Sequence, residues 1–391
     1  MKNFIGIVPE KIVFGAGVLN SLPEHIKGIG KKALIVTTKS TRPEKLALIE
    51  RVKELAGKAG IASSVYAEIE ENPRTTTCNA GRDFSKAEGC DFVIGLGGGS
   101  SMDAAKMIAM LCASGGDAED YLPGGKRFGI SDKELSCQPI VAITTTSGTG
   151  SESTNFAVMT NPANNNKPGT GHTFWYPTVS IVDPELTLSV PKKVTLNTGL
   201  DTFYHAFEAY VCNMDNDYVD LFAVPAMENV IKYLKKCVDE PGNIEYRSHM
   251  AFANTLAGTA IALGGTYAIH GMAHSVSGHF DAAHGAALTA IAPEIMEFSY
   301  KGNIKKFAGV AKMLGGDPSK SDEELAAECA PLFEKFLGTL DYNISLSDLG
   351  VTEDRIRRMA EDAFFAMKGA MDCTPVPITV EDAVNIYKKA M

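Results

Sequence analysis

Four of the chain's eight histidines lie in one short stretch. They are His270, His274, His279 and His284, in HGMAHSVSGHFDAAH. His270 and His274 are spaced i,i+4, so on a helix their side chains would share one face. Imidazole is the commonest metal ligand in proteins because its neutral form offers a lone pair near pH 7. The stretch therefore predicts a metal-binding segment on a helix.

A second i,i+4 pair lies upstream, Asp201 and His205 in GLDTFYHAFE. Three imidazoles and one carboxylate would form a compact site for a divalent first-row metal. A single histidine on an apolar helix is more often a satisfied core residue. Two pairs in segments this poor in charge favour a metal site. The donor set accepts Fe²⁺, Zn²⁺, Mn²⁺ or Co²⁺, so it does not select the metal.

A glycine loop follows a predicted buried strand at 91–96 (DFVIGL) and leads into a helix predicted from 102 to about 112. Glycines at such a turn let a phosphate approach the backbone, and the helix N-terminus supplies free N–H donors. The loop lacks the GxGxxG spacing, so a purely structural turn remains an alternative. On that alternative, Asp103 is a capping carboxylate and Lys106 a surface lysine.

A polar loop at 144–152 (TTTSGTGSE) follows another predicted strand, 140–143. Small hydroxylated residues and glycines allow close contact with a polar ligand and supply hydroxyl donors. A turn with a capping box would explain single Ser or Thr residues. It explains less well an unbroken run of them after a buried strand. The loop is a second candidate binding segment.

The elements that would position these loops alternate in the first part of the chain. Strands are predicted at 33–37, 63–66, 91–96 and 140–143, with a helix from Pro43 to near Gly60. Repeated strand–helix–strand order indicates a parallel sheet, whose ligands bind beyond the carboxyl ends of the strands. A polar loop is expected at 161–171.

The second part of the chain shows long helical periodicities and no convincing strand. A boundary near 184–195 separates an α/β domain, 1–184, from an all-helical domain, 185–391. The clearest helical segments are 198–211, 220–238, 247–264 and 323–337.

Composition narrows the class of protein. The 391 residues are 45% apolar and 21% charged, and a net charge of −10 argues against nucleic acid or an anionic membrane as the main partner. The uncharged run 250–269 is long enough to span a membrane, but its Ala, Gly, Thr and Asn254 favour a buried helix. The N-terminus shows no signal peptide. Eight cysteines without a CxxC pair indicate reduced thiols in a cytoplasmic enzyme.

The motifs GGGSSMDAAK, TTSGTGSE, GLDTFYHAFE and HGMAHSVSGHFDAAHG, in this order, resemble the iron-containing (group III) alcohol dehydrogenase family. Its members include 1,3-propanediol dehydrogenases, butanol dehydrogenases and lactaldehyde reductases. The similarity covers nearly the whole chain, from KIVFGAG to the last helices. It implies an N-terminal α/β Rossmann-like dinucleotide-binding domain and an all-α C-terminal metal-binding domain.

The resemblance also implies roles for particular residues. The metal ligands fall on Asp201, His205, His270 and His284, and His274 lies near the substrate as a catalytic group. Phe156 and Cys373 match positions that line the substrate pocket. The positions that match cofactor-binding residues are Thr38, Lys39, Asn72, Gly98, Gly99, Ser100, Asp103, Thr145, Thr146, Thr149, Lys167 and Leu186.

Three positions depart from the family's pattern. NAD-specific members often carry an acidic residue after the first strand, where this chain has Thr38 followed by Lys39. Without that carboxylate a 2′-phosphate would not be repelled, and Lys39 or Arg42 could pair with it. NADP(H) is therefore expected over NAD(H). The family's NPR is replaced by TPVPIT after Cys373, and Thr144 stands where many members have proline.

The implied activity is hydride transfer between a nicotinamide cofactor and a small primary alcohol, diol or aldehyde, with Fe²⁺ as the implied metal. Relatives form homodimers or larger homo-oligomers. One alternative is a glycerol-dehydrogenase-like polyol enzyme, which keeps only three protein ligands. The other is a non-catalytic nucleotide-binding or metal-storage protein. Metal-dependent turnover of 1-butanol would separate the enzymes from the non-catalytic class.

Overall fold

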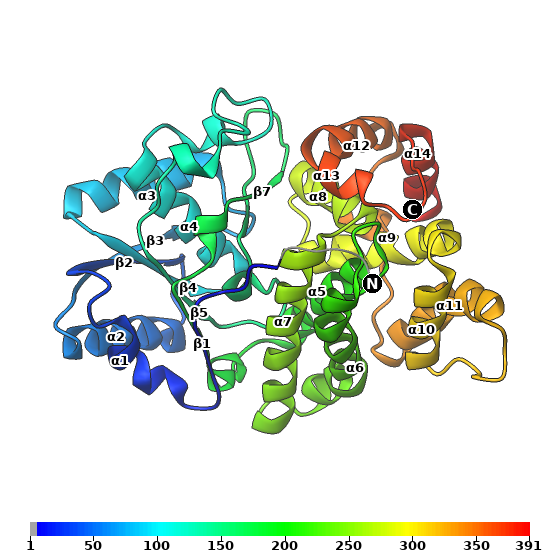
Figure 1. Ribbon diagram of the computed structural model, residues 1–391, viewed down its shortest axis with the longest axis horizontal. Helices are drawn as coiled ribbons and strands as arrows, with labels where there is room; N and C mark the ends of the chain where they lie inside the picture. The colour runs from blue at the N-terminus through cyan, green and yellow to red at the C-terminus, as the bar shows by residue number, and fades with distance from the viewer. Residues whose placement is uncertain (1–5) are drawn as a thin grey trace. The chain divides into compact units, whose positions relative to one another are not determined.

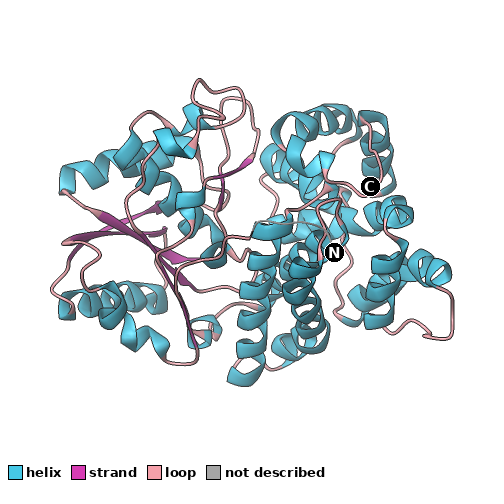
Figure 2. Cartoon of the chain, viewed as in Figure 1, coloured by secondary structure: helices cyan, strands magenta, loops and turns pink. Residues whose placement is uncertain are grey.

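The computed structural model describes residues 6–391. Residues 1–5, which belong to the stretch expected to carry no signal peptide, lie outside the described residues. The chain forms two compact units: Val8–Ser189, and Val190–Met391 together with residues 6 and 7. The passage from one unit to the other, between Ser189 and Val190, lies within the range 184–195 in which the boundary was expected. The first unit is α/β and the second is helical (Figure 1, Figure 2).

The α/β unit contains a six-stranded parallel sheet with the strand order β1-β8-β5-β4-β2-β3. The central strands are continuous apolar runs because both of their faces are covered. All four expected strands are present, and β1 and β8 join them at the other side of the sheet. The strands are β1 (Ile12–Phe14), β2 (Lys32–Thr38), β3 (Ala62–Ile69), β4 (Phe92–Gly97), β5 (Ile140–Thr144) and β8 (Val179–Val182).

Successive side chains of β2 pack on opposite faces of the sheet, as the strand period of two requires. Leu34 and Val36 belong to one core cluster, with residues of α3 and α4, and Ala33 and Ile35 belong to the other, with residues of α1 and α2. The sheet thus lies between two helical layers (Figure 2). These helices are α1 (Leu22–Ile26), α2 (Pro43–Lys58), α3 (Thr75–Glu88) and α4 (Gly99–Ser114).

Two expectations about local structure were wrong. Helix α4 begins at Gly99, not at residue 102, because Gly97 turns the chain with φ 150° and Gly98 is already the N-cap. The range expected to be a loop, 161–171, ends in a strand, β7 (Gly169–Gly171), which pairs antiparallel with β6 (Phe156–Val158). A Gly-Thr-Gly strand has no apolar alternation, so only its pairing with β6 defines it.

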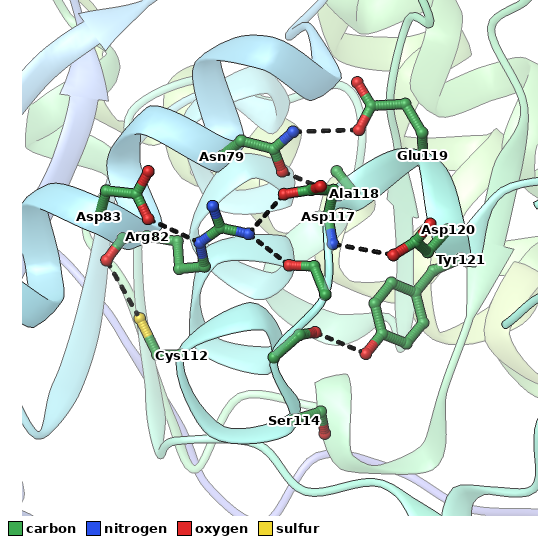
Figure 3. A network of polar contacts seen from close by, with 12 residues as sticks. Asn79, Arg82, Asp83, Cys112, Ser114, Asp117, Ala118, Glu119, Asp120 and Tyr121 are labelled. Atoms are coloured by element: carbon green, nitrogen blue, oxygen red, sulfur yellow. Dashed lines mark hydrogen bonds and ion pairs between the residues drawn. The ribbon is translucent and has the colours of Figure 1, made fainter. Parts of the chain in front are cut away.

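A polar network fastens α3 to the turn that follows α4 (Figure 3). The Arg82 guanidinium bonds to the Gly116 carbonyl and, at 2.7 Å, to Asp117. One turn away, the Asn79 side chain accepts from the Ala118 amide at 2.8 Å and donates to Glu119 at 3.0 Å. These bonds hold the far end of α4, whose near end carries the glycine loop.

The second unit is helical throughout, and residues 190–391 contain no strand. The four helices expected here are present, each starting one to six residues earlier than expected. The uncharged run 250–269 ends one helix and begins the next. No helix in the described part of the chain is both long and apolar enough to cross a membrane. The helices are α5 (Lys192–Val211), α6 (Asp217–Asp239), α7 (Ile244–Gly264), α8 (Ala268–Phe280), α9 (His284–Ser299), α10 (Ile304–Met313), α11 (Asp322–Thr339), α12 (Glu353–Ala366), α13 (Lys368–Asp372) and α14 (Val380–Lys389).

Candidate metal centre and coenzyme loops

Three helices bring the predicted metal ligands together. Asp201 and His205 lie one turn apart on α5, His270 lies on α8, and His284 is the first residue of α9. One donor atom from each of Asp201, His270 and His284 lies within 4.8 Å of the others. The sequence pairs alone could not show that the two segments meet.

The three histidines converge on one carboxylate oxygen, Asp201 Oδ1. His270 Nε2 lies 3.3 Å from it, His205 Nε2 3.7 Å and His284 Nε2 3.9 Å. The rings of His205 and His270 are stacked with centroids 4.4 Å apart. Three imidazole nitrogens around a buried carboxylate are the donor chemistry of a divalent transition-metal site.

His274 lies on α8 one turn after His270 and is 4% exposed. Its ring centroid is 6.2 Å from that of His270 and 5.1 Å from that of His284. It is therefore beside the four predicted ligands, and it is absent from the compact donor group. This position suits the predicted role in handling a substrate proton.

The structure adds a residue that the sequence reasoning missed, Glu208 on α5. Its Oε1 lies 2.5 Å from His270 Nδ1, and its Oε2 accepts from the backbone amide of Tyr267 at 2.6 Å. Burial by itself would lower the pKa of His270, but the carboxylates of Glu208 and Asp201 outweigh it and raise that pKa to about 9. The available signal was the spacing of Asp201, His205 and Glu208, which continues along one helix face.

The pairing of His270 tests whether these residues fit a metal. A carboxylate on one ring nitrogen of a ligating histidine is the usual outer contact in metal sites, since it fixes the ring and its tautomer. Here Glu208 holds Nδ1, while Nε2 is buried without a hydrogen-bond partner and faces Asp201. The residues present fit a divalent metal.

Close packing of the α9 backbone against α5 allows His284 to lie near Asp201. A Cβ on Gly285 would collide with the backbone carbonyl of Asn197 on α5. Two turns further along α5 and one turn further along α9, the Tyr204 hydroxyl donates to Thr289 Oγ1, with the two oxygens 3.1 Å apart. A glycine directly after His284 therefore sets the approach of α9 to the helix that carries Asp201.

In the α/β unit, the predicted coenzyme residues lie at or after the carboxyl ends of five strands. Thr38 ends β2, the others come after β2, β3, β4, β5 and β8, and Lys167 lies between β6 and β7. Gly97 at the end of β4 is in register with Thr144 at the end of β5, so the two loops start side by side. Parallel α/β sheets bind ligands at this edge.

The two central loops touch. A Cβ on Gly98 would lie 2.9 Å from Thr146 Oγ1, and a Cβ on Gly99 would collide with the Thr149 side chain. The Thr145 amide donates to the Gly97 carbonyl at 2.9 Å. Ser100, in the first turn of α4, is partly exposed. Together, the loops place the N-terminal turn of α4 beside threonine side chains.

Lys106 is not a surface lysine, and Asp103 is not an exposed cap. Both are buried. Lys106 Nζ donates to three backbone carbonyls of the second loop and its continuation, those of Ser151 (2.8 Å), Thr154 (3.0 Å) and Phe156 (2.8 Å). Asp103 accepts from Ser151 Oγ at 2.6 Å and from the Val158 amide at 3.0 Å. Burial lowers the pKa of Lys106 to about 8.

A lysine of α2 that was not among the predicted coenzyme residues contacts the last residue of β2. Lys45, in the first turns of α2, donates to Thr38 Oγ1. Burial, with a contribution from Arg42, lowers the pKa of Lys45. Lys39 Nζ instead lies 3.3 Å from Glu68 Oε2, in a pair whose side chains are mostly exposed.

The remaining predicted coenzyme and substrate residues come from several different elements. Lys167 Nζ donates to Asn72 Oδ1 at 2.8 Å, so these two predicted coenzyme residues are in contact although 95 positions apart. Leu186, after β8, packs partly buried against the α1–α2 core. Phe156 begins β6 in the α/β unit, and Cys373 follows α13 in the helical unit. The Cys373 carbonyl accepts from the Asn213 amide at 3.0 Å.

A parallel α/β sheet of the kind that binds nucleotides and a buried histidine–carboxylate centre in one chain are the features expected of a metal-dependent dehydrogenase. The two matching family descriptions agree: "Iron-containing alcohol dehydrogenase" matches residues 9–184, and "Fe-containing alcohol dehydrogenase family, C-terminal" matches residues 195–391. The chain belongs to the iron-containing alcohol dehydrogenase family, and its class of activity is metal-dependent alcohol oxidation or aldehyde reduction.

Similar proteins span the whole chain. It is 35% identical over 393 residues to the NAD-dependent methanol dehydrogenase of Bacillus methanolicus, covering 100% of both chains. It is 33% identical to the 1,3-propanediol dehydrogenase of Citrobacter freundii, covering 93% of this chain and 92% of the relative. An archaeal alcohol dehydrogenase from a Red Sea brine pool superposes with a TM-score of 0.94 at 36% identity over 100% of both chains.

Proposed function

We propose that Asp201, His205, His270 and His284 hold an iron(II) ion and that the chain interconverts small primary alcohols or diols with their aldehydes. The observation that carries this proposal is the convergence of three histidine nitrogens within 3.9 Å of Asp201 Oδ1. Zn²⁺ or another divalent metal would satisfy the same donors.

The chain's own residues supply positioning and a path for a proton. Glu208 orients His270, and Gly285 lets His284 approach α5. When bound, the metal would act as a Lewis acid on the substrate oxygen, and the nicotinamide would carry the hydride. His274, buried beside His270 and His284, would take the hydroxyl proton on a ring nitrogen and pass it on.

Metal content and turnover together test this assignment. Metal-free protein would be reloaded with Fe²⁺, Zn²⁺, Mn²⁺ or Co²⁺ and assayed on methanol, 1-butanol and 1,3-propanediol. We expect His270→Ala to lose bound metal and nearly all turnover, and His274→Ala to keep its metal and lose rate. Wild-type metal content in His270→Ala would refute the ligand set. Loss of metal in His274→Ala would refute the separate role of that histidine.

The coenzyme proposed is NADP(H) in preference to NAD(H), although the methanol dehydrogenase relative is named NAD-dependent. Thr38 presents a hydroxyl where a carboxylate would repel a 2′-phosphate, and Lys45 places an ammonium group directly against that hydroxyl. A charge-assisted contact to phosphate is stronger than a neutral one. Lys39 contributes less in this proposal, since it is exposed and paired with Glu68.

The test is kcat/KM for NADPH and NADH with one aldehyde. Lys45→Met should lower the value for NADPH about tenfold, which is typical for loss of a charged hydrogen bond. Lys39→Met is the matched control and should change it little. Thr38→Asp should reverse the preference. A wild type that favours NADH tenfold would refute the proposal, and a loss confined to Lys39→Met would refute the role of Lys45.

One observation favours the polyol alternative with three ligands. The compact donor group comprises Asp201, His270 and His284, without His205. If that alternative holds, His205→Ala should keep its metal and the wild type should turn over glycerol faster than 1-butanol. If four residues bind the metal, His205→Ala should lose metal affinity, and the wild type should favour 1-butanol.

A further inference from the structure

The fourth histidine of the stretch, His279, belongs to a polar cluster outside the metal donors. Its side chain is 4% exposed and lies in the last turn of α8. His279 Nε2 is 2.8 Å from Asp362 Oδ2, and His279 Nδ1 is 2.8 Å from Arg355 Nη2. Both partners come from α12, which packs against α8 (Figure 1).

These two contacts determine the tautomer of His279. Arginine only donates hydrogen bonds and stays protonated, so Nδ1 must accept from Arg355 with its lone pair. Nε2 faces a carboxylate oxygen and must therefore carry the proton that it donates to Asp362. His279 is thus neutral with its proton on Nε2, and it is bonded at both ring nitrogens.

The partners are themselves held in place. Arg358 Nε donates to the same oxygen of Asp362 at 2.9 Å, one helical turn away on α12. The Arg355 guanidinium lies over the ring of Phe280, 5.9 Å from its centroid. The final turn of α8 is therefore held to α12 by one imidazole that bonds a carboxylate and a guanidinium group, and a second guanidinium group on α12 bonds the same carboxylate.

The residues that follow this contact between α8 and α12 lead directly to His284, a proposed metal ligand. After Phe280 it reverses through Asp281, which has the left-handed φ of 50°, and α9 begins at His284. His274 and His284 lie on either side of His279 in sequence, five residues away in each direction. The orientation of the last turn of α8 thus sets where this short turn delivers His284.

We infer that His279 is a positioning residue for the metal centre: by bonding to Asp362 and Arg355 it fixes the turn that presents His284. The inference rests on the proposed role of His284 as a ligand. His279 does not touch the donors, so its loss should weaken metal binding without abolishing it. Outer contacts of this kind typically change metal affinity about 10- to 100-fold.

The test compares Co²⁺ binding to the metal-free full-length wild type and two variants. His279→Phe keeps a ring but loses both hydrogen bonds, whereas His279→Gln offers one donor and one acceptor on the same group. We expect His279→Phe to bind Co²⁺ about 10- to 100-fold more weakly, with an altered visible spectrum. His279→Gln should resemble the wild type in both respects.

A matched control separates positioning from general destabilisation. His249 on α7 also makes a side-chain contact: its Nδ1 lies 2.8 Å from Asn229 Oδ1, and its ring stacks on that of Tyr233. His249→Phe should leave Co²⁺ affinity unchanged when titrations are run well below each variant's unfolding temperature. The inference would be overturned if His279→Phe bound Co²⁺ with wild-type affinity, or if His249→Phe weakened Co²⁺ binding as much as His279→Phe does. It would also be overturned if His279→Gln bound Co²⁺ as weakly as His279→Phe. Unchanged metal content in His284→Ala would instead refute the ligand assignment.

Discussion

At the scale of single residues, Glu208 shows how a carboxylate can serve the site without being among the proposed ligands. It bonds His270 Nδ1 and also accepts from the backbone amides of Tyr267 and His270, so it ties the start of α8 to α5. The His270 ring is consequently presented with Nε2 towards Asp201. The orientation of this donor therefore depends on Glu208.

Glu208→Gln should weaken metal binding about 10- to 100-fold, because the amide removes the charge that fixes the His270 ring and places N–H groups against N–H groups. Chelator competition on the purified variant measures the affinity. Asp132→Asn is the matched control, since Asp132 pairs with His172 at 2.6 Å in the other unit. Equal affinity in the wild type and Glu208→Gln would contradict the positioning role.

At the scale of elements, each unit uses a glycine to bring two segments into contact. Gly99 lets the start of α4 meet the loop after β5, and Gly285 lets the start of α9 meet α5. Neither glycine has a left-handed φ, so the requirement is one of space and not of backbone conformation. Each contact lies beside one predicted binding site.

Substituting each of these glycines should impair one predicted site and leave the other unaffected. Gly99→Ala would push the Thr149 side chain aside and should weaken coenzyme binding while metal content stays at the wild-type level. Gly285→Ala meets the Asn197 backbone and should lose metal while coenzyme binding is retained. Coenzyme titration and metal analysis of both variants give the comparison.

Gly57→Ala in α2 is the control for these substitutions, because a Cβ there would meet no atom within 4 Å. It should leave both ligands unaffected and stabilise the fold by about 0.5–1 kcal/mol, as expected for alanine in a helix. If Gly99→Ala and Gly57→Ala bind coenzyme equally well, the close loop contact is unimportant for binding.

At the scale of the whole molecule, the buried ammonium group of Lys106 makes stability depend on pH. Its pKa falls from the ordinary 10.5 to about 8 in the folded state because burial disfavours the charge. The cost of that charge is fully present below pH 8 and is relieved as the pH rises towards 10.5. The contribution of Lys106 to the free energy of unfolding therefore increases with pH over this window.

We expect the free energy of unfolding of the wild type, minus that of Lys106→Met, to rise between pH 7.5 and pH 10. The full change is about 3 kcal/mol at most, because a tenfold change in a proton-binding constant corresponds to roughly 1.4 kcal/mol. Urea unfolding at both pH values measures it, and the subtraction removes groups common to both proteins. Lys106→Gln serves if the methionine variant does not fold. A difference that is constant with pH would contradict a lowered pKa.

The sequence by itself determined the features that depend on local order. The i,i+4 pairs Asp201/His205 and His270/His274 lie on helices, since period and spacing decide which side chains share a helix face. The alternation of strands and helices indicated a parallel sheet. The positions of the glycine and threonine loops, each directly after a strand, could be read from the order of residues along the chain. The family was likewise recognisable from four ordered motifs.

Only the tertiary structure decided which distant groups meet. Glu208 reaches His270, Lys167 reaches Asn72, and Lys106 is buried against carbonyls some 45 to 50 positions away. These pairings arise from packing between elements, which sequence spacing does not encode. The same side chain can be a solvated lysine or a buried ammonium group, and a motif histidine such as His279 can bind a carboxylate in place of a metal. The side chain's neighbours in space, supplied by other elements, decide between these roles.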